Sequence, residues 1–422
     1  MQTGRRSRRR APSRALSALA AAAVVLLGTA CTPQRAEPPA AADGVEVFTW
    51  WASGSEKVGL DALVAVFAEQ HPDTPFIDGA IAGGAGSAAK DLLRSRLAND
   101  DPPDTFQVHG GAELAAHAEA GDLRSLAPLY TELGLRDVLP EGLLEMLTVD
   151  GIPYAVPSNV HRANVLWANP AVLQEAGVDP SATYTSVDEW FVALEAVRAT
   201  GRTPLAVAST WTQVHLLEQV LLARLGPEGY RGLFDGTTDA ASAEVGLGLA
   251  DFERLLGFTN PDRNRLDWQD ATQRVVGGEA AFTVMGDWAA VAFPGEVAWA
   301  PFPGTAGTYD LVLDAFTLPV DAREPEAARR WLRTVASPEA QIALSSAKGA
   351  IPAREDVGTE GLGAYQQAAM ASFRTDVLVP SLTHGSAADP EVLEAVTRAV
   401  AHFTSGTSTV TQFQSELADA LG

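Results

Sequence analysis

The sequence predicts an α/β fold with more than one domain. Beyond residue 43, short extended apolar runs alternate with longer segments of helical period, which is the pattern of layered α/β proteins. The chain has 422 residues, a length that suits two domains better than one hydrophobic core. The folded region is expected to begin after residues 32–42, which are rich in Pro and Ala.

The first part of this region predicts three strands separated by helices. Leu60, Leu63 and Phe67 recur at helical spacing and define one apolar helix face. Gly86 comes just before a second helix, and Gln107-Val108-His109 ends the third strand. The predicted strands are residues 45–50, 76–81 and a run that starts from 103–108, and the predicted helices are residues 55–70, the segment after Gly86 and most of 113–147.

The second part repeats the alternation and adds extended segments that are expected to cross between domains. Ser186 and Glu189 have the spacing of a capping box, and Gly201 is expected to end the helix they start. The predicted crossings are residues 152–158, 310–319 and 349–352, the predicted strands 164–169, 280–285 and 296–301, and the predicted helices 186–200, 326–335, 338–347, 390–403 and 410–421.

The first 43 residues predict export and a lipid anchor. A cluster of Arg is followed by an apolar run at 16–27 and by small residues just before Cys31, the only cysteine. The apolar run is too short for a secure membrane span, which needs about 20 residues. We expect residues 1–30 to be a signal peptide, Cys31 to carry lipid, and 31–43 to be a linker that tethers the protein to the outer face of the cytoplasmic membrane. The alternative is a plain secreted protein, because Gly28 stands where lipoproteins usually carry Leu.

The charge balance argues against a nucleic-acid partner. The formal net charge is −23, and it becomes −29 without residues 1–30, which hold six Arg and no acid. Such a surface repels phosphate backbones. The motif search also predicts neither a metal site nor a cofactor.

Aromatic and polar residues at the ends of predicted strands form the first candidate site. Trp50 and Trp51 end the first strand, and ligands of open α/β sheets bind beyond the carboxyl ends of strands. Aromatic faces beside carboxylates and amides suit sugars, which have apolar C–H faces and many hydroxyls. Gln107 and His109 share one face of the third strand. Glu56 is a further candidate, although it could instead form a capping box with Ser53.

Weaker single candidates lie farther along the chain. Trp288 follows a predicted strand, Asp314 lies in a predicted crossing, and His384 precedes a glycine in a loop. Lys348 is one of only three Lys in the chain. Each could equally be structural.

Three patterns in the sequence resemble enzyme motifs and are alternatives to a binding function. Ser87 and Lys90 have the Ser-x-x-Lys spacing of penicillin-recognising acyl-enzymes, but no Lys-Thr-Gly follows. The Gly84-x-Gly86 pattern imitates a dinucleotide loop without the expected acidic residue. Glu56 and Asp314 would be the carboxylates of a glycosidase only if they faced each other.

Six stretches, in order along the chain, resemble the extracellular solute-binding lipoproteins of ABC sugar importers, above all the glucose- and mannose-type monosaccharide-binding proteins. They are Trp50-Trp51-Ala52-Ser53-Gly54-Ser55-Glu56, Ala82-Gly83-Gly84-Ala85-Gly86, Phe106-Gln107-Val108-His109-Gly110, Val156-Pro157-Ser158-Asn159-Val160-His161-Arg162, Met285-Gly286-Asp287-Trp288 and Ala347-Lys348-Gly349-Ala350-Ile351-Pro352-Ala353-Arg354.

The resemblance implies a two-lobed periplasmic-binding-protein-like α/β fold with a central cleft and crossing hinge strands. We expect lobe 1 to comprise residues 44–155 and 310–349, and lobe 2 to comprise 156–309 and 350–422. The resemblance also implies that ten residues line a sugar site: Trp50, Trp51, Glu56, Gln107, His109, Trp211, Trp288, Asp314, Lys348 and His384.

The implied function is binding, not catalysis. We expect a monomer that captures a monosaccharide, glucose or a close epimer, outside the membrane and delivers it to ABC permease subunits. The alternatives are an oligosaccharide-binding protein of the same family and an exported serine acyl-enzyme using Ser87 and Lys90. We further expect Lys348 and Asp314 to be hydrated without ligand, so that replacing either weakens binding by about 2–5 kcal/mol and affects folding less.

Overall fold

The structure is a computed structural model that describes residues 44–82, 86–293, 295 and 297–422. The predicted signal peptide, Cys31 and the linker lie outside the described residues, as do Gly83, Gly84 and Ala85 of the glycine-rich stretch. Among the described residues, no helix is both long and apolar enough to cross a bilayer.

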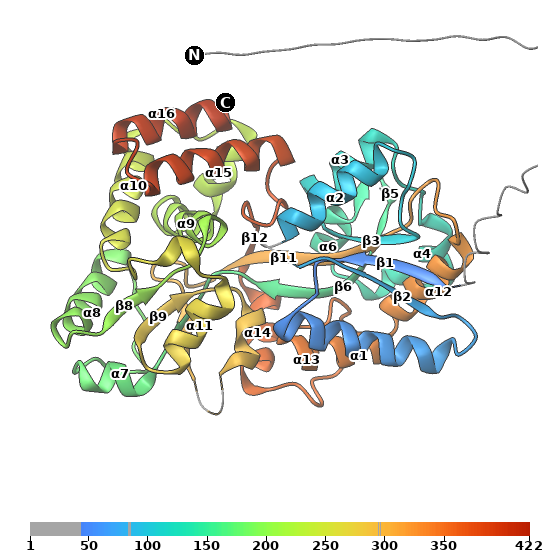
Figure 1. Ribbon diagram of the computed structural model, residues 1–422, viewed down its shortest axis with the longest axis horizontal. Coiled ribbons are helices and arrows are strands. Elements are labelled where there is room, and N and C mark those ends of the chain that lie inside the picture. Colours follow the sequence, from blue (N-terminus) through green and yellow to red (C-terminus); the bar gives the residue numbers. More distant parts are fainter. Residues whose placement is uncertain (1–43, 83–85, 294, 296) are drawn as a thin grey trace, which may run out of the picture. The chain divides into compact units, whose positions relative to one another are not determined.

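A six-stranded mixed sheet organises one half of the described region (Figure 1). Strand β1 is parallel to its neighbours β2 and β3, and β11 is antiparallel to both β3 and β6 and parallel to β12. The strands are β1 (Val45–Thr49), β2 (Phe76–Ala80), β3 (Thr105–His109), β6 (Ala155–Arg162), β11 (Thr308–Thr317) and β12 (Val377–Pro380).

Helices cover both faces of this sheet. Trp331 fills the core beneath it, with ring centroids 5.3 Å from Phe67, 5.6 Å from Phe76 and 5.6 Å from Phe316. In Figure 1, α1, α12 and α13 lie on one side of the sheet, and α2 and α3 lie on the other. The helices of this half are α1 (Gly54–Gln70), α2 (Ser87–Leu97), α3 (Ala112–Ala120), α4 (Ala127–Leu133), α5 (Leu135–Val138), α6 (Glu141–Met146), α12 (Pro325–Ala336), α13 (Pro338–Lys348) and α14 (Ala364–Thr375).

A four-stranded sheet in the order β10-β7-β9-β8 organises the other half. Its core is a second apolar cluster that includes Trp190, Phe252 and Phe282. Its strands are β7 (Val165–Ala168), β8 (Thr203–Ala206), β9 (Ala280–Val284) and β10 (Ala298–Pro301), and the elements around it are α7 (Pro170–Glu175), α8 (Val187–Ala199), α9 (Thr210–Asp235), α10 (Ala243–Leu256), α11 (Trp268–Val276), η3 (Asp287–Ala292), α15 (Pro390–Thr404) and α16 (Val410–Leu421).

Strand β11 changes its neighbour along one edge. Strand β6 pairs with β11 from Leu311 to Thr317, so β12 and β3 must share the opposite edge. Strand β12 pairs with Thr308–Leu311, and β3 takes over at Asp314. The β6 register also shifts between Asp314 and Ala315. Asp314 therefore stands directly opposite His109 on one side and Asn159 on the other.

Most elements expected from the sequence are confirmed, usually to within a residue or two. The capping box at Ser186 forms only in part: the Ser186 hydroxyl accepts from the Glu189 N–H, but the Glu189 carboxylate accepts from Thr185. The sequence patterns did not predict α9, α10, α11, α14, β8 and β12. Helix α9 was not predicted because polar residues interrupt the periodic pattern of its apolar face. The buried polar side chains include Gln213, His215 and Glu218.

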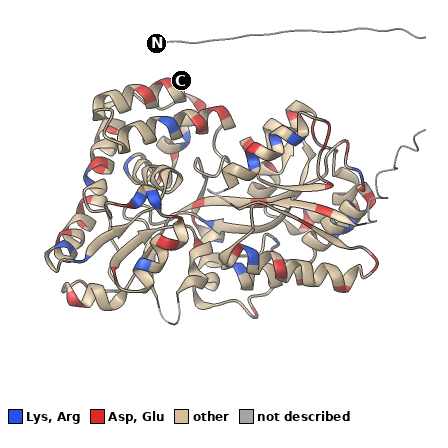
Figure 2. Ribbon diagram, in the orientation of Figure 1, with Lys and Arg blue, Asp and Glu red and all other residues tan. Residues whose placement is uncertain are grey.

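The acidic excess lies mainly on the outside. Figure 2 shows Asp and Glu distributed over outer helices that include α1, α7, α10 and α16, with Lys and Arg interspersed. A small number of acids are instead buried near the centre of the molecule, where they build the site described next.

Candidate functional site

A pocket opens where β1 and β3 end and where β11 carries Asp314. It contains about 590 Å³ of space between atoms, a volume that includes the open solvent at its mouth. Its lining residues are Trp50, Ser53, Glu56, Gly86, His109, His161, Trp211, Asp267, Trp268, Gln269, Trp288, Val312, Asp314, Lys348 and His384.

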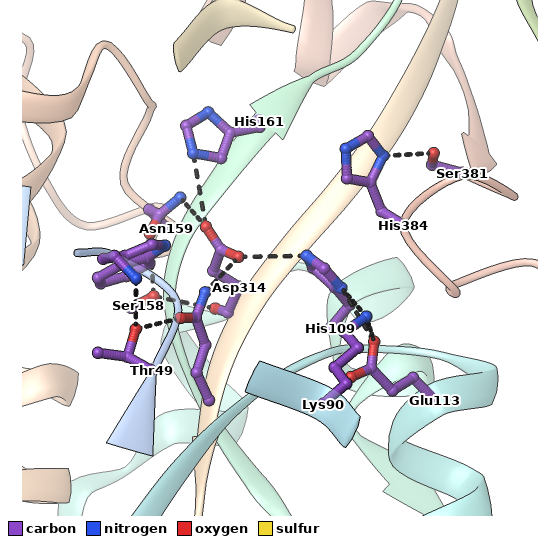
Figure 3. Close-up of polar contacts among 12 residues, drawn as sticks. Thr49, Lys90, His109, Glu113, Ser158, Asn159, His161, Asp314, Ser381 and His384 are labelled. Atoms are coloured by element: carbon purple, nitrogen blue, oxygen red, sulfur yellow. Dashed lines mark hydrogen bonds and ion pairs between the residues drawn. The ribbon is translucent and has the colours of Figure 1, made fainter. Parts of the chain in front are cut away.

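Asp314 is the centre of a buried polar network at the base of the pocket (Figure 3). Lys348 Nζ donates to its Oδ2 at 2.6 Å. The side-chain amides of Asn159 and Gln107 donate to its two oxygens, each at 3.0 Å. His109 Nε2 and His161 Nε2 lie farther away, at 3.6 and 3.5 Å from the carboxylate. The paired register of β3, β6 and β11 places these groups together.

The cations around Asp314 control its ionisation. Burial alone raises the pKa of a carboxyl, but Lys348 and His161 outweigh it and hold the pKa of Asp314 well below its usual range. His161 is affected in the opposite sense: burial and Lys348 lower its pKa, yet the carboxylates of Asp287 and Asp314 raise it overall. The His161 Nδ1 side is hydrogen-bonded to Asp287. The base of the pocket therefore holds a compensated set of charges.

Lys348 and Asp314 are both buried at the base of the pocket. Each is only 2% exposed. The expectation that they are hydrated without ligand stays a prediction. The Lys348 ammonium lies 3.9 Å from the centroid of the Trp51 ring, so it is covered on its other side as well. The ion pair is consequently part of the folded core and not only of the binding surface.

His109 is held by a second buried ion pair. Lys90 Nζ donates to Glu113 Oε2 at 2.7 Å, and His109 Nδ1 lies 2.9 Å from the same oxygen. Despite burial, Lys90 and His109 lower the pKa of Glu113 to about 2. Burial, with Lys90, also lowers the pKa of His109. Because ionised Glu113 can only accept, the ring donates to it from Nδ1–H.

Glu56 lies in the first turn of α1 and lines the pocket. The capping-box interpretation is wrong, because the Ser53 side chain at the N-cap makes no capping hydrogen bond. Burial raises the pKa of Glu56 to about 7; Asp314 adds to the rise, and Lys348 opposes it. Glu56 can therefore gain or lose a proton near neutral pH at the wall of the pocket.

Aromatic rings form the upper walls of the pocket. Trp50 packs against Gly86, whose φ is +87° and whose added Cβ would lie 2.9 Å from the indole. Glycine is thus required there by both backbone conformation and space. On the other side, the Trp288 and Trp211 rings lie 5.1 and 6.4 Å from His384.

The structure brings eight of the ten predicted site residues to the pocket lining. These are Trp50, Glu56, His109, Trp211, Trp288, Asp314, Lys348 and His384. Trp51 and Gln107 lie behind the wall: Trp51 is fully buried beneath Lys348, and Gln107 bridges Thr49 and Asp314. Both position other groups instead of lining the pocket.

Sequence reasoning missed His161 and the start of α11. His161 belongs to a quoted motif, and its alternation with Asn159 on β6 was a usable signal that both share a face. Asp267, Trp268 and Gln269 come from an unpredicted helix start. Asp267 and Asp270 form a capping box there, which was the signal available in the sequence.

The serine acyl-enzyme pattern does not assemble. Ser87 is exposed and is the first residue of α2, whose N-cap is Gly86. Lys90 is engaged by Glu113. Within the described residues, neither side chain lines the pocket.

One group of side chains could in principle hold a metal ion. Donor atoms of His215, Glu218 and His384 lie within 4.8 Å of one another. The Glu218 oxygens, however, already accept from Tyr230, Ser381 and two backbone N–H groups, and His384 Nδ1 is bonded to Ser381. These bonds fit a hydrogen-bond network better than a metal site.

Replacing Lys348 by Ala is expected to destabilise the fold by about 3 kcal/mol. That is the lower end of the range for breaking a buried ion pair, because His161, Asn159 and Gln107 still face Asp314. Urea unfolding of the ligand-free protein measures this loss. Lys57→Ala is the matched control, because its partner Asp61 is exposed and such pairs contribute at most about 1 kcal/mol. Equal losses in the two variants would contradict a structural ion pair at Lys348.

Replacing Glu56 by Gln is expected to change how stability depends on pH. A carboxyl whose pKa is raised in the folded state stabilises the fold at low pH, and this contribution is lost as pH rises from about 4.5 to about 7. The Tm of Glu56→Gln minus that of the parent should therefore increase between pH 5 and pH 8, by the equivalent of about 1–3 kcal/mol. Glu253→Gln, on an exposed part of α10, should give the same Tm difference at both pH values. A flat profile for Glu56→Gln would contradict the raised pKa.

Comparison with known proteins places the chain in a family. The model of the bacterial extracellular solute-binding protein family matches residues 51–342. An uncharacterised ABC transporter extracellular-binding protein of Pyrococcus horikoshii is 33% identical over 81% of this chain and 79% of its own. A probable sugar-binding periplasmic protein of Mesorhizobium japonicum is 30% identical over 90% of this chain and 94% of its own. The xylose/arabinose-binding protein of Haloferax volcanii is 29% identical over 83% and 78%.

Solved structures support the fold. A chitin oligosaccharide binding protein matches with a TM-score of 0.79 and 21% identity, over 90% of this chain and 98% of that one. This confirms the predicted two-lobed solute-binding fold. The relatives and the solved structure named here are all described as binding proteins, in agreement with the binding function predicted from the sequence. The chain belongs to the bacterial extracellular solute-binding proteins.

Proposed function

We propose that the protein is the sugar-binding component of an ABC importer and that its ligand is a monosaccharide, glucose or a close epimer. The observation that carries this proposal is the composition of the pocket: indole rings above, and a charged and amide network around Asp314 below. Indole faces suit the C–H faces of a sugar ring, and charged groups bind hydroxyls with about 1.5–3 kcal/mol per hydrogen bond. Relatives described as sugar-binding and xylose/arabinose-binding support the same ligand class.

The size of the pocket favours one sugar ring. The indoles of Trp50, Trp211 and Trp288 converge on the same small space, and the start of α11 lines it as well. A longer sugar would have to extend through the mouth. The polar groups would hold the ring's hydroxyls, and the protein would present the sugar to its permease as a monomer.

A calorimetric panel tests the ligand class. Glucose, mannose, galactose and xylose should include at least one tight ligand, whereas disaccharides, chitin oligosaccharides and a penicillin should bind weakly or not at all. Binding should change Trp fluorescence, and Trp288→Phe should reduce the change. Trp299→Phe, at a partly exposed site away from the pocket, is the control. Tight binding to longer sugars alone would assign the oligosaccharide function, and no binding to any hexose or pentose would refute the monosaccharide proposal.

We also propose that Cys31 carries the lipid that tethers the protein to the outer face of the cytoplasmic membrane. The sequence Gly28-Thr29-Ala30-Cys31 supports this proposal. In cells, Cys31→Ser should move the protein from the membrane fraction to the soluble fraction. Ser53→Ala, far from the cleavage site, should leave its distribution unchanged. Equal membrane association of Cys31→Ser and parent would contradict the anchor.

A further inference from the structure

His384 lines the pocket, but the residues that orient its ring lie behind the pocket wall. It follows β12 in a short turn, is 5% exposed, and lies with its ring edge-on to His109 at 5.6 Å and to His215 at 5.8 Å. Its Nδ1 is 2.9 Å from the Ser381 hydroxyl, and Figure 3 shows the other ring nitrogen on the side away from Ser381. Among the described residues, no hydrogen bond reaches that second nitrogen, Nε2.

Glu218 of α9 holds the turn. It is 1% exposed, and its two oxygens together accept four hydrogen bonds. Oε1 accepts from the Tyr230 hydroxyl at 2.6 Å and from the Leu382 N–H. Oε2 accepts from the Thr383 N–H and from the Ser381 hydroxyl, both at 3.2 Å. Glu218 therefore accepts hydrogen bonds from three consecutive residues, Ser381, Leu382 and Thr383, of the turn that carries His384.

The direction of these hydrogen bonds follows from the donors. Each Glu218 oxygen accepts from a backbone N–H, which can only donate; these bonds lower the pKa of the carboxyl, although burial leaves that pKa raised overall. The Ser381 hydroxyl donates to Oε2 of the same carboxyl group. The Ser381 hydroxyl has one hydrogen, and it points to Glu218. The Ser381 oxygen is then left to accept from His384 Nδ1–H.

The protonation state of His384 completes the argument. Burial, together with the neighbouring His109, His215 and Lys90, holds the pKa of His384 well below its usual range, so the ring is neutral. A neutral imidazole carries one N–H, and here it is on Nδ1. Nε2 is consequently a bare acceptor.

We propose that Glu218 and Ser381 are positioning residues that hold His384 in its Nδ1–H tautomer, so that Nε2 accepts a hydrogen bond from a hydroxyl of the bound sugar. Neither residue lines the pocket, yet together they would set its hydrogen-bonding polarity at this point. A ligand group that only accepts, such as an ether oxygen or fluorine, would be rejected there, because two acceptors would face each other. The part of this inference that concerns binding rests on the proposed function; the part that concerns the tautomer does not.

The tautomer can be measured without any ligand. Long-range proton–nitrogen NMR spectra of ¹⁵N-histidine-labelled protein distinguish Nδ1–H from Nε2–H rings, and His384→Gln identifies the His384 signals. The parent should show Nδ1–H. Ser381→Ala should shift His384 toward the Nε2–H form, and Ser381→Thr, which restores a hydroxyl, should restore Nδ1–H. Ser386→Ala is the matched control in the same turn, since the Ser386 hydroxyl has no partner among the described residues.

Sugar affinity provides the second readout. Ser381→Ala should bind the best sugar of the panel roughly 10-fold more weakly, whereas Ser381→Thr and Ser386→Ala should stay within about twofold of the parent. An Nε2–H ring in the parent, or an unchanged tautomer in Ser381→Ala, would overturn the proposal. The parent measurement decides this even if Ser381→Ala fails to fold. A locked Nδ1–H ring in a protein that binds no sugar would refute the proposed function and the binding part of this inference while upholding the positioning role.

Discussion

The ionised carboxylate of Asp314, buried against Lys348, is the interaction on which the rest of the site depends. A charge at 2% exposure is tolerated only when it is paired and fully hydrogen-bonded, and the pair alone would scarcely offset its desolvation. The amides of Asn159 and Gln107 supply the remaining hydrogen bonds. Since these residues come from β6 and β3, the site can form only if β11 pairs with both strands in the observed register.

The pocket histidines share a second constraint. Each is tied on its Nδ1 side to an acid: His109 to Glu113, His161 to Asp287, and His384 to Glu218 through Ser381. Nε2 of each ring therefore faces the interior or the pocket. Whether it donates or accepts depends on the acid on the Nδ1 side, which lies outside the pocket. Groups oriented in this way lose little freedom when a ligand arrives, which is the physical advantage of a preorganised site.

The same polar network links ligand binding to the fold. Asp314 and Lys348 are near points where the chain changes its neighbours, and Lys348 ends α13 next to Gly349 in the left-handed region. Replacing either residue would leave the other charge buried without its partner. Positions behind the wall, such as Ser381, are better suited for changing the site's hydrogen bonding without removing a charge from the core.

The sequence by itself determined the α/β class, most strands and helices, and most of the residues that line the pocket. The periodicity of apolar residues and the kinds of side chain at the ends of strands are visible in residues that are close in the sequence. Trp50, Gln107 and His109 could therefore be found without coordinates. Tertiary structure alone decided that Trp51 and Gln107 lie behind the wall, that Ser53 and Glu56 form no capping box, and that Asp314 and Lys348 are buried together. These outcomes depend on β-sheet register and on charges more than 30 residues apart in the chain, which no local pattern encodes.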